Sequence, residues 1–214
     1  ILIEDAAESL GSKFKSKYSG TIADIGIYSF QAVKNITTGE GGAVVTRSKK
    51  IFQKLKLFRS HGVLKKRYYH VVPGHNFRLS NLLASIGYSQ LNRIKKIIVS
   101  RKKVLSFYKK YLNIEKFKLQ QIKKNIDFVP WTLAIKINKK FNQKKRDSMI
   151  TALAKKGIET RNGFYSPSEQ PIYSNKKLPN SIMLSRTIIC LPFYEELNEK
   201  QVKYICSSLN KILK

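Results

Sequence analysis

Three short apolar runs near the start of the chain, each followed by polar or glycine-rich residues, constrain the fold most strongly. They occupy residues 1–3, 25–30 and 41–46. Uninterrupted apolar runs of this length are typical of buried strands in a parallel sheet, both faces of which are covered. Helical patterns follow at residues 49–59 and, after Ser80-Asn81, over about 30 residues with at most one break. The first half of the chain is therefore predicted to be α/β.

The second half has a different organisation. Residues 113–127 are polar and charged, so we place a domain boundary there and expect domains at residues 1–112 and 113–214. Strands and helices then alternate as in a small α+β unit. The expected elements are strands at 130–137, 158–160 and 187–191, a helix at about 144–156 that stops at Gly157, and a last helix from about Asn198.

The chain is strongly basic. Its 214 residues include 42 Lys or Arg and 13 Asp or Glu, a formal net charge of +29. The lysines occur in pairs along almost the whole chain, which favours solvated faces over a dedicated nucleic-acid patch. A basic nucleic-acid-binding protein remains an alternative interpretation. The hydrophobic content of 42% excludes a disordered chain, and no apolar run is long enough to span a membrane.

The cysteines and histidines show no metal-binding pattern. Cys190 and Cys206 lie in apolar contexts without metal-ligand spacing, so we expect buried reduced thiols, as in a cytoplasmic protein. The histidines are not paired at metal-binding intervals; they are His61, His70 and His75. We expect no metal site.

One segment carries most of the chemical information. Ser29 ends the second apolar run, Lys34 follows five residues later, and a glycine-rich turn completes the loop. This is not the spacing of a nucleoside-triphosphate loop. With Asp5 at the end of the first strand, the set suits pyridoxal phosphate: an amine to form a Schiff base, a carboxylate to keep the pyridine nitrogen protonated, and a hydroxyl for the phosphate. Each residue alone is more commonly structural, so spacing leaves both interpretations open.

Longer motifs resemble one family. The segment Glu4-Asp-Ala-Ala-Glu-Ser-Leu-Gly11, the turn at 20–26 and the loop at 29–42 are similar to those of the DegT/DnrJ/EryC1/StrS family. Further similarities occur at 59–62, 74–80, 89–91, 157–161 and 191–192, so the resemblance covers nearly the whole chain. Members are mostly pyridoxal-phosphate-dependent aminotransferases of nucleotide-linked keto-sugars. The resemblance implies the C-terminal part of a fold-type I aminotransferase, with a partial large α/β domain and a small α+β domain.

The resemblance assigns roles near the cofactor. It implies that Lys34 is the Schiff-base lysine and proton carrier, that Asp5 pairs with the pyridine nitrogen, and that Ser29 holds the phosphate. Glu8 would lie near the pyridoxal ring. Gln31 occupies a variable position of the same loop.

The resemblance also implies a homodimer with shared active sites. Asn76 would reach the cofactor phosphate of the neighbouring subunit, and Arg78 would face the carboxylate of the amino donor or the sugar nucleotide. Arg161 would contact an anionic substrate. The implied reaction takes an amine from glutamate and delivers it to a nucleotide-linked 4-keto or 3-keto deoxyhexose in polysaccharide or glycan synthesis.

Two alternatives concern the same family. A dehydratase branch carries His in place of the Schiff-base lysine, and Lys34 argues against it. Family members also have a long segment before the Asp-bearing strand, whereas this chain begins with Ile1. We therefore expect a truncated fragment that holds an incomplete site and does not catalyse the reaction alone.

Overall fold

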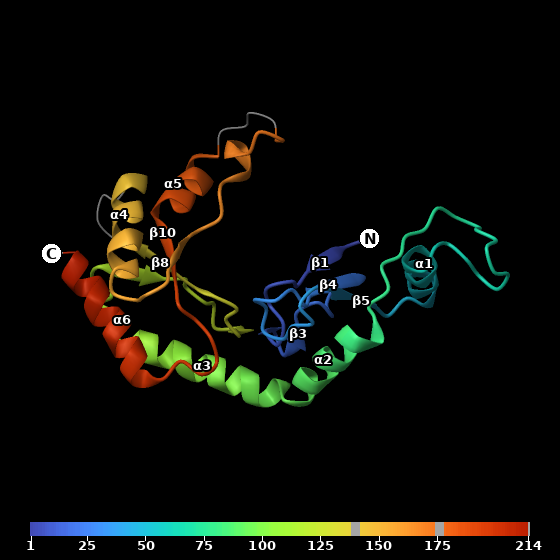
Figure 1. Ribbon diagram of the computed structural model, residues 1–214, viewed down its shortest axis with the longest axis horizontal. Helices are drawn as coiled ribbons and strands as arrows, with labels where there is room; N and C mark the ends of the chain where they lie inside the picture. The colour runs from blue at the N-terminus through green and yellow to red at the C-terminus, as the bar shows by residue number, and fades with distance from the viewer. Residues whose placement is uncertain (138–141, 174–177, 214) are drawn as a thin grey trace. The chain divides into compact units, whose positions relative to one another are not determined.

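The computed structural model describes residues 1–137, 142–173 and 178–213 (Figure 1). The chain forms two compact units. The first comprises Ile1–Ile98 and Lys123–Trp131, and the second comprises Val99–Ile122 and Thr132–Lys214. Compact units need not coincide with the domains of a longer protein, so the division at residue 112 stays a prediction.

The main sheet of the first unit has three strands in the order β1-β4-β5. Strand β1 (Ile3–Asp5) pairs with β4 (Ile25–Ser29) in parallel, as predicted. Strand β5 (Gly42–Thr46) pairs with β4 in antiparallel, so the prediction of a third parallel strand was wrong. The physical reason is the connection: residues 30–41 form a loop and no crossover helix, and a chain that returns directly pairs antiparallel.

The expected burial of the first strand was also wrong. Ile1 is 95% exposed and Ile3 is 57% exposed. In the described residues β1 is an edge strand of a three-stranded sheet, so one of its sides has no neighbouring strand. The apolar run therefore indicated a strand correctly but not its surroundings.

A second small sheet joins distant parts of the first unit. It contains β2 (Lys13–Phe14), β3 (Lys17–Tyr18) and β7 (Ile126–Asp127) in the order β3-β2-β7. Lys13 pairs with Asp127 in antiparallel register. This pairing attaches residues 123–131 to the first unit.

The helices of the first half follow the predicted pattern. Helix α1 (Lys49–Arg59) begins after Ser48, whose side chain accepts a hydrogen bond from the Ile51 N–H. The long helical stretch is broken once, at Arg93, into α2 (Asn81–Asn92) and α3 (Ile94–Tyr111). Ser80 caps α2 in the same way as Ser48 caps α1.

The second unit is built on a four-stranded antiparallel sheet. Its strands are β6 (Phe117–Leu119), β8 (Leu133–Ile137), β10 (Ile188–Leu191) and β9 (Arg161–Asn162), in that order across the sheet. The expected strand at 158–160 was displaced, because Ile158 is buried in the core while residues 161–162 pair with β10. The core also includes Tyr108, Phe117, Ile135, Leu153, Ile189, Val202 and Leu209.

The helices of the second unit are α4 (Gln143–Ala154), α5 (Pro179–Thr187) and α6 (Glu199–Ile212), with a short 3-10 turn, η1 (Pro167–Glu169). Gly157 follows α4 with φ of +72°, as expected for a helix stop. None of the described helices has the length and apolar character needed to cross a membrane.

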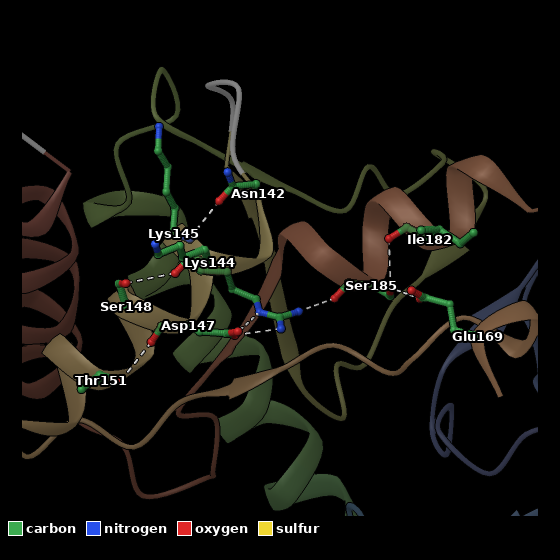
Figure 2. A network of polar contacts seen from close by, with 10 residues as sticks. Asn142, Lys144, Lys145, Asp147, Ser148, Thr151, Glu169, Ile182 and Ser185 are labelled. Carbon is green, nitrogen blue, oxygen red and sulfur yellow. Dashed lines mark hydrogen bonds and ion pairs between the residues drawn. The ribbon is translucent and has the colours of Figure 1, made fainter. Parts of the chain in front are cut away.

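A polar network ties three of these elements together (Figure 2). The buried guanidinium of Arg146 on α4 donates to the Ser185 carbonyl on α5 at 2.5 Å and contacts Asp147 at 2.8 Å. The Ser185 hydroxyl donates to Glu169 of η1 at 2.9 Å. A buried cation needs such partners, so the network sets how α4, α5 and η1 pack.

Candidate active site

The loop between β4 and β5 is held firmly at its base. The Phe30 N–H donates to the Gly41 carbonyl at 2.9 Å, and the Thr38 N–H donates to the Phe30 carbonyl at 2.9 Å. Gln90 of α2 accepts from the Thr37 N–H at 3.1 Å and donates to the Thr37 carbonyl at 2.7 Å. The Gln90 side chain therefore satisfies both the N–H and the carbonyl of Thr37, and this fixes the loop to α2.

The tip of the loop has buried neighbours. Asn35, Ile36 and Thr38 are each at most 6% exposed. The side-chain amide of Asn35 donates to the Leu10 carbonyl at 3.2 Å. The Lys34 N–H closes a turn to the Gln31 carbonyl at 2.9 Å. Lys34 thus projects from a backbone with little freedom to move.

The Lys34 side chain has two partners. Its Nζ lies 3.3 Å from Glu8 Oε1. The same atom lies 3.9 Å from the centroid of the Trp131 ring. The side chain is only 13% exposed. The ammonium group is therefore held between a carboxylate and an aromatic face.

Asp5 and Ser29 stand at the same edge of the sheet. Asp5 ends β1 and Ser29 ends β4, and these two strands run parallel. Asp5 Oδ1 accepts from the Ala7 N–H at 3.0 Å, and Ser29 Oγ accepts from the Gln31 N–H at 3.3 Å. Open α/β sheets bind ligands at the carboxyl ends of parallel strands.

The chemistry of this edge fits pyridoxal phosphate. It presents a carboxylate at the end of β1, a hydroxyl at the end of β4, and an amine on the loop that follows β4. The neighbouring Glu4 has a structural task instead, since its carboxylate accepts from the Ile22 N–H at 3.1 Å. The turn of residues 20–26 also depends on glycine, because a Cβ on Gly26 would overlap the Gly20 carbonyl.

Asn76 and Arg78 form a separate exposed group. Arg78 Nε donates to Asn76 Oδ1 at 3.1 Å, and Arg78 Nη2 lies 3.4 Å from His61 Nε2. In the part of the chain that the structure describes, neither shares a hydrogen bond or ion pair with Lys34 or its neighbours. Close by is a hollow of about 400 Å³, lined by His61, His70, Val71, Val72, Pro73 and Gly74.

Arg161 lies in the second unit. It begins β9, and its guanidinium carbon is 5.6 Å from the centroid of the Phe164 ring. Its expected contact with an anionic substrate stays a prediction. Within the described ranges, no three His, Cys, Asp or Glu side chains gather in a metal-binding arrangement.

Sequence reasoning missed two residues of this site. Trp131 was expected only as part of a strand, and Gln90 only as part of a helix segment, residues 89–91, that resembles the family. Trp131 is the single tryptophan of the chain and follows Pro130 in an apolar run, which gives no sign of its partner. Gln90 is partly buried on a helix that has no fully buried residue, and its place in the family-like segment 89–91 was the one available sign.

Comparisons with known proteins point to one family. The profile of the DegT/DnrJ/EryC1/StrS aminotransferase family matches residues 1–210. GDP-perosamine synthase of Escherichia coli O157:H7 is 37% identical, with 98% of this chain and 57% of the relative covered. A UDP-4-amino-4,6-dideoxy-N-acetyl-beta-L-altrosamine transaminase of Campylobacter jejuni is 32% identical, with 99% and 58% covered.

A solved structure shows the same fold. Helicobacter pylori PseC, described as an aminotransferase in pseudaminic acid biosynthesis, superposes with a TM-score of 0.90 at 28% identity, with 98% of this chain and 58% of PseC covered. The chain thus spans a little over half the length of the relatives it matches. With a family profile that covers nearly all of its residues, the chain belongs to the DegT/DnrJ/EryC1/StrS aminotransferase family.

Proposed function

We propose that the protein containing this chain transfers an amino group from an amino acid, glutamate in the first instance, to a nucleotide-linked keto-deoxysugar. Pyridoxal phosphate is the cofactor of this family. The observation that carries the proposal is the fixed position of Lys34 on its loop, at the sheet edge where Asp5 and Ser29 end their strands. Relatives named for GDP- and UDP-linked amino sugars support the substrate class.

Each side chain of the edge has a task in this reaction. When bound, pyridoxal phosphate supplies an aldehyde and an electron-accepting ring that protein side chains lack. The Asp5 carboxylate would hold a proton at the pyridine nitrogen, and the Ser29 hydroxyl would donate to the phosphate. The Lys34 amine would anchor the cofactor and would carry the proton between the amine-bearing carbon of the substrate and the aldehyde carbon of the cofactor.

Glu8 assists Lys34. Glu8 Oε1 lies 3.3 Å from Lys34 Nζ, and this ion pair orients the lysine side chain toward Glu8. Glu8 thus contacts the lysine itself, and its place beside the pyridoxal ring is part of the proposal.

The proposal includes a homodimer in the cytoplasm. Asn76 and Arg78 lie on an exposed loop and hydrogen-bond each other, on a surface that a neighbouring subunit can approach. The two cysteines are free and buried, which suits a reducing compartment. The product would enter polysaccharide or glycan synthesis.

The test uses the full-length protein that contains this chain. It is incubated with pyridoxal phosphate, glutamate and a panel of GDP- and UDP-linked 4-keto and 3-keto deoxyhexoses. We expect an amino sugar and 2-oxoglutarate by mass spectrometry from at least one sugar. Lys34→Ala should abolish both products, whereas Lys50→Ala, at an exposed position of α1, should preserve them. Absence of product from every sugar, or unchanged product from Lys34→Ala, contradicts the proposal.

A further inference from the structure

We infer that Trp131 is a positioning residue for Lys34. The inference rests on the proposed role of Lys34 as the cofactor-bearing amine. Two contacts connect the pair: Trp131 Nε1 donates to the Val33 carbonyl at 2.8 Å, and the Trp131 ring centroid lies 3.9 Å from Lys34 Nζ. One side chain therefore holds both the backbone before the lysine and the charged end of the lysine.

The backbone on either side of Lys34 is tied down. Before it, the Val33 carbonyl accepts from Trp131. After it, the Asn35 side chain donates to the Leu10 carbonyl at 3.2 Å. With both neighbours fixed, the freedom that remains belongs to the flexible four-carbon stem of Lys34. The aromatic face limits that freedom, because it attracts the ammonium to one position.

Trp131 fixes the position of the Lys34 ammonium more strongly than Glu8 does. The Glu8 side chain is 48% exposed, and ion pairs with an exposed partner contribute little. Trp131 is 9% exposed and Lys34 is 13% exposed at its side chain. Cation–π contacts and hydrogen bonds both gain strength when water is excluded.

Trp131 is itself fixed by the fold. Two residues earlier, Val129 is fully buried and its N–H donates to Ser12 Oγ at 3.0 Å. Strand β7 pairs with β2 just before that point. The segment that carries Trp131 is therefore attached to residues 12–14, next to the Leu10 carbonyl that holds Asn35. The arrangement presents the Lys34 amine in advance, as preorganised catalysis needs.

Two variants separate the contacts. Trp131→Phe keeps an aromatic face and removes the indole N–H, and Trp131→Leu removes both. The readout is the rate at which pyridoxal phosphate attaches to Lys34 in the full-length protein, stopped with borohydride and counted by peptide mapping. We expect Trp131→Phe to slow attachment by about twofold to tenfold, the value of one buried hydrogen bond. Trp131→Leu should slow it further, because the ring that confines the Lys34 side chain is also lost.

The control is Phe52→Leu. Phe52 is 52% exposed and its ring lies 5.5 Å from Lys56 Nζ, a contact of the same kind away from the site. Attachment in this variant should match wild type. Wild-type rates in both Trp131 variants overturn the inference while the role of Lys34 stands. If wild-type protein carries the cofactor on another lysine, the proposed function fails instead.

A second readout needs no Trp131 variant to fold. The indole N–H of Trp131 gives one proton–nitrogen NMR signal from this chain, because the chain has one tryptophan. In full-length protein without cofactor, this signal should resist hydrogen exchange and should move in Lys34→Met. A rapidly exchanging indole, or a signal unchanged by Lys34→Met, overturns the inference.

Discussion

Ser12 and Val129 exchange two hydrogen bonds although 117 residues separate them. Ser12 Oγ accepts from the Val129 N–H at 3.0 Å and donates to the Val129 carbonyl at 3.4 Å. Ser12 is 6% exposed and Val129 is fully buried. The two hydrogen bonds attach residues 123–131 to the rest of the first unit. This attachment places Trp131 beside Lys34.

Ser12→Ala should destabilise the first unit. The change leaves two buried backbone groups of Val129 without this partner, which lowers the free energy of unfolding by about 1–3 kcal/mol. Denaturant unfolding of the full-length protein measures the loss. Ser207→Ala removes an exposed hydroxyl that bonds the Tyr204 carbonyl and should change stability little. Equal changes in the free energy of unfolding from the two variants would show that the Ser12 hydrogen bonds do not stabilise the first unit.

The sequence predicted those features that are set locally. The strand at residues 25–29 and helices α1 and α6 follow from apolar periodicity and from capping residues such as Ser48 and Asn198. The direction of β5 could not be predicted, because an apolar run does not contain its pairing partner. The contact of Trp131 with the loop could not be predicted for the same reason, since its hydrogen-bond acceptor, the Val33 carbonyl, lies 98 residues away.

The candidate site likewise contains residues that local motifs predict and residues whose long-range contacts the sequence does not predict. Asp5, Ser29 and Lys34 were found because their spacing and neighbouring residues form motifs. Their position at one sheet edge followed from the parallel pairing of β1 with β4. The anchors of the loop, Gln90 and Trp131, carry no motif that names their targets. Such anchors become visible only when the chain is folded.

Asp5→Asn should separate cofactor binding from turnover. The amide can still lie beside the pyridine nitrogen but cannot stabilise its positive charge. Loss of one opposite charge changes a proton equilibrium by about one to three pKa units, so we expect turnover to fall about tenfold to a thousandfold. Steady-state kinetics with saturating cofactor measures kcat. Asp24→Asn, at an exposed carboxylate that accepts from the Leu2 N–H, is the matched control. A near-normal kcat for Asp5→Asn would show that another group stabilises the positive charge on the pyridine nitrogen.

Glu169 makes the stability of the second unit depend on pH. Hydrogen bonds from Arg186 and then Ser185 hold the pKa of its carboxyl below the ordinary value of 4.5. The stabilisation is therefore present above pH 4.5 and is lost as pH falls through the lowered pKa of the folded protein. Glu169→Gln lacks it, so its stability should fall short of wild type at pH 7 and approach wild type in acid.

Denaturant unfolding at several pH values tests this expectation. Glu159→Gln, at an exposed position of the same unit, should follow wild type throughout. A difference between wild type and Glu169→Gln that stays constant with pH would contradict the proposed charge effect.

Mixed dimers test the shared site. Lys34→Ala subunits and Asn76→Ala/Arg78→Ala subunits should each be inactive alone. In a mixed dimer one site carries both defects and the other carries none. Random exchange makes half of the dimers mixed, so activity should return to about a quarter of wild type. No recovery after subunit exchange has been demonstrated by mass spectrometry would show that Asn76 and Arg78 act within their own chain.

The position of the cofactor on Lys34 is the central claim. The full-length protein is incubated with pyridoxal phosphate, reduced with borohydride and digested, and the mass of the reduced cofactor is located by peptide sequencing. We predict this mass on the peptide that contains Lys34, its loss in Lys34→Ala, and its full retention in Lys50→Ala. The added mass on a different lysine, or an equal yield from Lys34→Ala, would contradict the account.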